Sequence, residues 1–195
     1  MSDSDQTNRH TLALTWVESM GGPLIVVPVS VLHKWSGCTE DGIIVGGTDE
    51  PDDYDRACAV EGPAEAISLG DAEHVSALVL GDEPATTCYL PEQGAFVRWL
   101  GANSETDLVA AAGAVLSDEA TPWKACGVWE TDGPAVLMDS AEAGEDLGVP
   151  YPDGKGRPDE APVPVAAGRW RVRVFYKTDG CCSVGVVQLL PATGP

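Results

Sequence analysis

Histidine and cysteine are the side chains whose spacing most directly signals metal binding or nucleophilic catalysis. The three histidines, His10, His33 and His74, are isolated, and no HxH, HExxH or cysteine-histidine pair at zinc spacing occurs. Cys181 and Cys182 are adjacent, whereas redox and zinc pairs are separated by two residues. We therefore expect no metal ion and no cofactor, and we interpret the histidines as surface or helix-end residues.

The six cysteines are an even number, which would suggest disulfides in a secreted chain. However, the first ten residues are polar and form no signal peptide, and no apolar run approaches the ~20 residues of a membrane span. We therefore expect a cytoplasmic protein with reduced, mostly buried thiols. The cysteines concerned are Cys38, Cys58, Cys88, Cys126, Cys181 and Cys182.

Carboxylates dominate the charged residues, with 31 acidic against 11 basic side chains and a net charge of −20. Residues 39–93 hold fourteen acids and one base, Arg56, which gives −13 of that total. Such a field repels phosphates and anionic lipid and attracts basic partners, although an acidic source proteome would also explain it. The run from Asp49 to Asp55 lacks the DxDxDG spacing and final glutamate of a calcium loop. No phosphate-binding or nucleophile motif occurs, and no local pair of carboxylates stands out as catalytic.

Basic residues gather near the C-terminal end, where residues 155–177 contain six of the eleven. Arg169, Arg171 and Arg173 alternate with apolar residues, so a strand would place all three on one face. We favour pairing within the chain, with the acidic half, over binding of phosphate or nucleic acid.

A turn between an aromatic residue and an apolar run organises the N-terminal part of the chain. Gly21-Gly22-Pro23 can reverse the chain, with positive φ at a glycine, before a strand at 24–27. Residues 31–36 then predict a short helical turn capped by Ser30. Leu32 and Trp35, three positions apart, would face the same core.

Short apolar runs at roughly ten-residue spacing predict a β-rich chain. One helix is clear at about 105–117, where Ser104 precedes an apolar stripe. Residues 139–164 are rich in glycine, proline and acids and read as a loop. Asp179-Gly180 predicts a hairpin turn. The expected strands are 11–17, 24–27, 43–45, 55–60, 64–69, 75–80, 86–90, 95–100, 124–130, 135–139, 168–176 and 183–190.

These elements predict an α+β fold, mostly antiparallel β with the helix at about 105–117 and the helical turn at about 31–36. We expect a flexible tail over 1–10 and a single β-rich domain over 11–195. A weak internal similarity leaves open a division into two related β halves, at about 54–118 and 123–191.

Several segments resemble immunity protein family 21 of bacterial polymorphic toxin systems, over nearly the whole span from Trp16 to about Pro191. The resemblance implies a small cytosolic protein that binds and neutralises a cognate toxin, with no catalytic residues to transfer. The segments that carry it are WVESMGGPLIVVP (16–28), KWSGC (34–38), DYDRAC (53–58), LVLGDEP (78–84) and YLP (89–91).

The function we expect is therefore stoichiometric occlusion of a toxin, with a basic nuclease as one candidate, and no binding of nucleic acid or membrane. Acidic side chains would steer association, and exposed aromatic residues would anchor it. A β-rich small-ligand or carbohydrate-binding module and an acid-dependent hydrolase remain as alternatives. The candidate partner-binding residues are Asp49, Glu50, Asp52, Asp53, Tyr54, Trp35 and Trp99.

Overall fold

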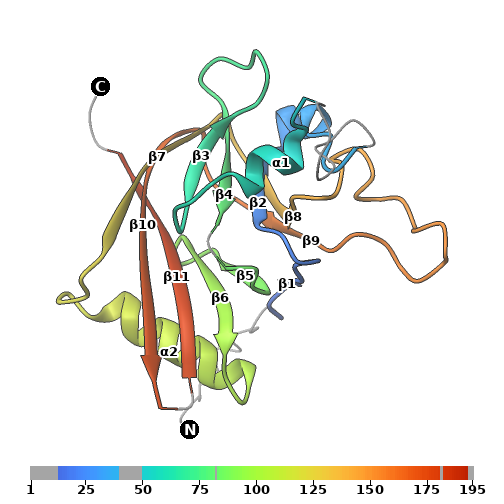
Figure 1. Ribbon diagram of the computed structural model, residues 1–195. Coiled ribbons are helices and arrows are strands. Elements are labelled where there is room, and N and C mark those ends of the chain that lie inside the picture. Colours follow the sequence, from blue (N-terminus) through green and yellow to red (C-terminus); the bar gives the residue numbers. More distant parts are fainter. Residues whose placement is uncertain (1–12, 40–49, 82, 181, 193–195) are drawn as a thin grey trace, which may run out of the picture.

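Two antiparallel sheets packed face to face make up most of the chain (Figure 1). The computed structural model describes residues 13–39, 50–81, 83–180 and 182–192, and all strands and helices below lie within them. Sheet A has the order β1 (Trp16–Val17), β5 (Thr87–Leu90), β6 (Ala95–Gly101), β11 (Cys182–Pro191), β10 (Gly168–Asp179), β7 (Lys124–Thr131). Sheet B has the order β3 (Glu65–Ser68), β4 (Ser76–Leu80), β2 (Leu24–Pro28), β8 (Ala135–Asp139), β9 (Glu160–Val163).

The core between the sheets follows from the alternation of side chains along each strand. In β2, Leu24 and Val26 point toward sheet A, while Ile25 and Val27 point to the opposite side. Sheet A contributes large buried side chains such as Phe96 and Trp129. Each fully buried large apolar side chain contributes about 1.5–3 kcal/mol to stability.

The outer face of sheet B is covered by two short helical segments and a loop. Helix η1 (Val29–Lys34) is a 3₁₀ helix, and α1 (Asp53–Cys58) lies beside it; residues 140–149 complete the cover. Trp35 packs here, 1% exposed, and its ring N–H donates to the backbone oxygen of Ser140 at 3.0 Å. The expectation that Leu32 and Trp35 share one core is confirmed.

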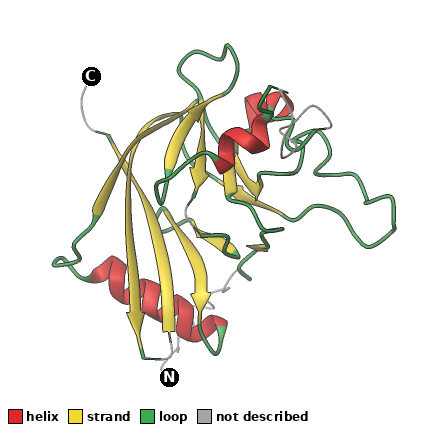
Figure 2. Ribbon diagram, viewed as in Figure 1, coloured by secondary structure: helices red, strands yellow, loops and turns green. Residues whose placement is uncertain are grey.

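The outer face of sheet A is covered in part by α2 (Glu105–Ser117), which lies at the opposite end of the molecule from α1 and η1 (Figure 2). Leu108, Ala112 and Val115 pack on β5, β6 and β11. Ser104 caps the helix by accepting from the backbone N–H of Asp107 at 3.1 Å. The predicted helix at about 105–117 is confirmed.

The predicted α+β class is confirmed, and so is the hairpin at Asp179-Gly180, because Asp179 pairs with Cys182 and Gly180 has φ +55°. Each sheet contains strands of both suggested halves. No helix among the described residues is long and apolar enough to cross a membrane.

Four local expectations were wrong, each for a physical reason. Residues 55–60 are not a strand, because Asp52 caps α1 there. The helical turn begins directly after Pro28 and has no side-chain cap from Ser30. Part of the predicted loop at 139–164 is β9, which pairs with β8 despite its proline. In the predicted strand at 11–17 only β1 pairs among the described residues, and the one at 43–45 lies outside them.

Candidate partner-binding surface

The predicted acidic residues divide into one exposed side chain and two that hold local structure. Glu50 is exposed, and Asp49 lies outside the described residues. Asp52 accepts from the backbone N–H of Asp55 at 2.8 Å, while Asp55 accepts from the N–H of Asp52 at 3.1 Å, which forms a reciprocal cap for α1. Burial opposes ionisation of Asp52, but hydrogen bonds from Thr39 and Asp55 outweigh it and lower its pKa.

The Asp53 side chain also holds local structure. Its carboxylate accepts from the backbone N–H of Ser36 and from Arg56, both at 2.8 Å. Arg56 in turn donates to the backbone oxygen of Ser68, so Asp53 and Arg56 together connect α1 to the segment after η1 and to β3. Asp52 and Asp53 therefore cannot be altered for a binding test without disturbing α1.

Other acidic side chains of residues 39–93 are exposed to solvent and make no hydrogen bonds of this kind with the described residues. They have no ion-pair partner among the residues that the structure describes. Residues 39–93 carry −13 of the net charge of −20, so this segment is more acidic than the rest of the chain. Exposed carboxylates on loops beside a rigid sheet produce a directional field. These side chains are Glu61, Glu65, Glu73, Glu83 and Glu92.

Tyr54 packs against the Gly21–Pro23 turn, where the chain leaves no room for another side chain. A Cβ added at Gly22 would lie 2.6 Å from the Tyr54 ring, and Gly21 has the positive φ, +121°. The expected turn is thus present, with its left-handed residue at Gly21. A hydrogen bond with Cys58, together with burial and nearby negative charge, raises the pKa of Tyr54 to about 12.

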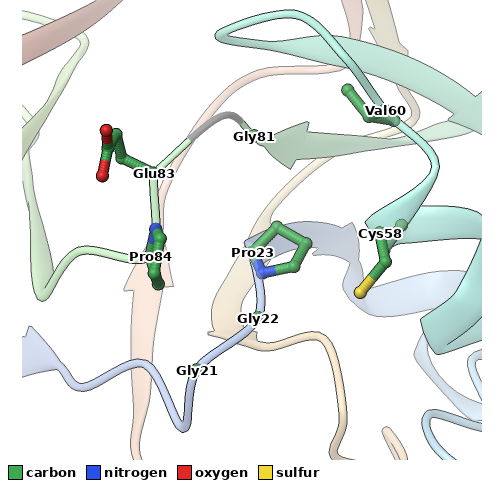
Figure 3. Close-up of a pocket in the computed structure, with 9 residues that line it drawn as sticks. Gly21, Gly22, Pro23, Cys58, Val60, Gly81, Glu83 and Pro84 are labelled. Atoms are coloured by element: carbon green, nitrogen blue, oxygen red, sulfur yellow. The ribbon is translucent and has the colours of Figure 1, made fainter.

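A small hollow of about 190 Å³ lies beside this turn (Figure 3). Gly21, Pro23, Cys58 and Pro84 line it, and the Glu83 carboxylate points away from Pro23 and Cys58. The hollow is smaller than the usual ligand pocket of about 300–1,000 Å³, and the described residues that line it bring no polar groups together. We therefore assign it to packing of the turn.

The two predicted tryptophans have different environments. Trp35 is buried, as described, so a partner cannot reach its ring in this conformation. Trp99 is half-buried and meets Trp16 edge to face, with 5.4 Å between ring centroids. The Trp16 ring N–H donates to Glu105 at 2.8 Å, which ties β1 to the first turn of α2.

Trp99 also lines a hollow of about 520 Å³ at the end of sheet A. Leu100 and Tyr176 lie in its wall with Glu83 and Pro84. Tyr176 is fixed by accepting a hydrogen bond from the buried guanidinium of Arg98 at 2.7 Å. The arrangement is an aromatic surface on a rigid support, suited to a flat or apolar group.

Four carboxylates surround another hollow, of about 280 Å³, between the 18–20 segment and the loop before β9. Asp139 is buried and accepts from the backbone N–H groups of Met20 and Ala141, at 2.6 and 2.8 Å, so it anchors the turn. Tyr151 donates to Glu142 at 2.7 Å, and partial burial and that contact raise its pKa to about 12. The carboxylates are Glu18, Asp139, Glu142 and Asp159, with Lys155 and Arg157 beside them.

The expectation of mostly buried thiols was wrong, and Cys181 lies outside the described residues. Cys88 is buried under α2, and burial raises its pKa to about 12. Cys38 and Cys58 are exposed, and Cys126 and Cys182 are partly so. The residue type alone therefore did not predict how far each cysteine is buried.

The arginines of β10 point to the outer face of sheet A, as the alternation predicts. Arg169 pairs with Glu130 of β7 at 2.7 Å, so its carboxylate comes from the neighbouring strand, outside the acidic segment 39–93. Arg173 lies over the Trp123 ring, 4.2 Å from its centroid. Pairing within the chain therefore occurs at Arg169, with a different partner from the one expected.

Comparison with known protein families matches residues 15–180 to the family described as Immunity protein 21. The chain belongs to this family. The match covers most of the chain and includes every strand described above except β11, which begins at Cys182. No curated protein and no solved structure gives a significant match. Family membership thus agrees with the resemblance found in the sequence.

Sequence reasoning missed three features of this surface. The Asp52-x-x-Asp55 spacing could have predicted a reciprocal cap, because carboxylates at these positions serve both donors. The hollow at Tyr176 has no sequence signal, since it depends on how far sheet A extends beyond sheet B. The Trp123–Arg173 stack joins residues fifty positions apart and could not be read from local spacing.

Proposed function

We propose that this protein binds a cognate bacterial toxin in the cytoplasm and neutralises it by stoichiometric occlusion, without catalysing a reaction. Membership of the Immunity protein 21 family over residues 15–180 is the observation that carries the proposal. The net charge of −20 supports a toxin with a basic surface, and a nuclease is one such candidate. The partner's identity and activity are part of the proposal.

Co-expression tests the proposal directly. The toxin is sought as the C-terminal domain of a large secreted protein encoded immediately upstream. Cells that express this domain should grow when the immunity protein is co-expressed, and the two purified chains should form a complex of fixed stoichiometry. Robust turnover of a substrate by the immunity protein alone, lost on mutating one carboxylate around the Glu142 hollow, would point to the hydrolase instead.

The acidic segment is proposed to act mainly on the rate of association. Exposed charges at the rim of an interface steer encounter, whereas short-range contacts decide dissociation. Charge reversal at Glu61, Glu65 and Glu73 should slow association about tenfold or more at low salt, and added salt should narrow the difference. Stopped-flow association that is equally fast for both proteins at low salt would leave these acids with a solubility role.

The aromatic hollow keeps a binding module as the second candidate function. Trp99 and Tyr176 both line this hollow, and aromatic rings are surfaces on which small flat ligands and sugars stack. Replacing Trp99 by Ala separates the two functions in a screen of sugars that follows tryptophan fluorescence. In a binding module, a sugar should quench the fluorescence of the wild type but not that of the variant. In an immunity protein, no sugar should quench the fluorescence of either.

A further inference from the structure

The outer face of sheet A beyond α2 carries an unusual charge pattern, which we call the arginine face. Arg173 is nearest to α2, and Arg171 and Arg169 follow along β10. The direct neighbours of Arg171 across the sheet are Val128 of β7 and Leu190 of β11, both half-buried. Sheet B packs against the other face of sheet A, the one that carries Val172 and Val174, so the arginine side chains face outward.

Only one of these arginines has a carboxylate partner among the described residues. Glu130 pairs with Arg169, and no carboxylate of the described chain lies within ion-pair distance of Arg171 or Arg173. Alternate residues of a strand are roughly 6–7 Å apart, so the two positive charges are neighbours. Their proximity contributes, after burial, to the lowered pKa of Arg173. In a chain with 31 acidic residues, this leaves a local positive surface facing solvent.

Arg173 is held in one orientation. Its Nε and Nη2 atoms both donate to the Gln188 side-chain oxygen, at 2.9 and 2.6 Å, while Trp123 supports the guanidinium plane. Trp123 is itself packed edge to face on Phe175, with 6.3 Å between ring centroids. A guanidinium fixed in this way loses little side-chain entropy on binding.

We propose that the arginine face is a docking surface for a carboxylate-bearing segment of a protein partner, held between Arg171 and Arg173. Charge complementarity determines the occupant: the face is positive, and arginine forms paired hydrogen bonds with a carboxylate. Nucleic acid fits less well, because a protein of charge −20 repels a phosphate chain. Arginine and tryptophan next to half-buried apolar residues are also the composition of protein interfaces.

The arginine face continues into the acidic segment. His74, on the loop that also carries Asp71 and Glu73, lies 4.0 Å from Glu130, and a hollow of about 510 Å³ separates His74 from Arg169. One partner can therefore meet negative and positive patches together. This inference rests on the proposed function, and it adds that the toxin presents a carboxylate beside its basic surface. Such a bipolar interface fixes orientation, because a reversed partner would meet like charges.

The test measures binding of an inactive toxin domain by titration calorimetry. Arg171→Glu should weaken binding at least tenfold, and Arg171→Gln should weaken it less. Lys155→Glu is the matched control, since it makes the same charge change at an exposed lysine in the loop before β9, and it should bind within twofold of wild type. Because Arg171 is exposed, the variants should keep the wild-type melting temperature.

A carbodiimide coupling experiment identifies the partner group. Arg171→Lys keeps the charge and should couple to an aspartate or glutamate of the bound toxin, located by mass spectrometry. Arg169→Lys should couple instead to Glu130 within the chain. If the wild-type protein binds the toxin and Arg171→Glu binds it with the same affinity, the docking role of the arginine face is overturned but the proposed function is not. The same holds if Arg171→Lys does not couple to the toxin. Binding of a 20-residue oligonucleotide that depends on Arg171 overturns the choice of a carboxylate. Failure of the wild-type protein to bind the toxin overturns the proposed function as well.

Discussion

The outer faces of the two sheets have been covered in different ways. Sheet B is closed by η1, α1 and the 140–149 loop, so that Trp35 and Met138 are fully buried under them. Sheet A carries one long helix over part of its outer face, and the arginine face beyond it stays open. The comparison teaches that the outer face of sheet B is closed by buried apolar contacts, whereas the arginine face of sheet A is a rigid surface whose exposed side chains can change at little cost.

The largest expected effect compares two tryptophans on these faces. Trp35→Ala should lower the free energy of unfolding by about 3–5 kcal/mol, because it opens a cavity and leaves the Ser140 oxygen without its donor. Trp123→Ala should cost about 1–2 kcal/mol, since the ring is half-buried and supports Arg173. Urea denaturation measures both. Equal losses would show that the two faces are equally important for stability.

The next effect concerns the turn beneath α1. Gly22→Ala should cost about 1–3 kcal/mol, because its Cβ would press on the Tyr54 ring. In a Tyr54→Ala background the same change should cost less than about 0.5 kcal/mol, since the obstacle is gone. Thermal melts of the four proteins give the coupling. A cost that persists without the Tyr54 ring would place the strain in the backbone of the turn.

A smaller effect is expected at the cap of α1. Asp52→Ala should cost about 1 kcal/mol at pH 7 through loss of the reciprocal hydrogen bonds. The pKa of Asp52 is lower in the folded chain than the ordinary 3.8, so its contribution is complete above that value and is lost as pH falls through the folded pKa. The difference between wild type and variant should therefore shrink below about pH 4. A difference that grows in acid would contradict the assignment.

The smallest effect is at the surface pair of the open face. Glu130→Gln should change stability by less than about 1 kcal/mol, because the Arg169 partner is half exposed and the pair is screened by salt. Denaturation at low and high salt measures it. The same variant leaves Arg169 without its carboxylate, so toxin affinity should stay the same or rise. A loss of affinity would show that Glu130, and not the arginines, meets the partner.

Sequence reasoning predicted the elements whose signals are local. The apolar stripe and Ser104 cap of α2 and the alternation around Arg171 were sufficient, because each depends on residues a few positions apart. Helix α1 was missed, since six residues hold too little periodicity to outweigh a β-rich context. The packing of Trp35 on the Ser140 carbonyl depends on contacts between distant segments.

The candidate site was harder to predict than the fold. Acidic residues could be counted, but the count does not separate Asp52 and Asp53, which hold α1, from Glu61 and Glu73, which face solvent. Whether an acidic residue holds the helix or faces solvent depends on which backbone N–H groups lie near its carboxylate in the folded chain. The alternation placed the three arginines on one face of a strand. Only the structure showed that this face points away from sheet B and that a single carboxylate among the described residues, Glu130, reaches it.

The strand order has a consequence for the timing of synthesis. Strand β2, near the N-terminus, lies between β4 and β8, and β6 lies beside β11, the last strand. Sheet B can therefore be completed only after β9 has left the ribosome, and sheet A only after β11 has done so. Domains with such long-range pairing fold slowly and expose strand edges until they close. A chain truncated within β11 would lack the strand that joins β6 to β10, so sheet A should form only after β11 has been synthesised.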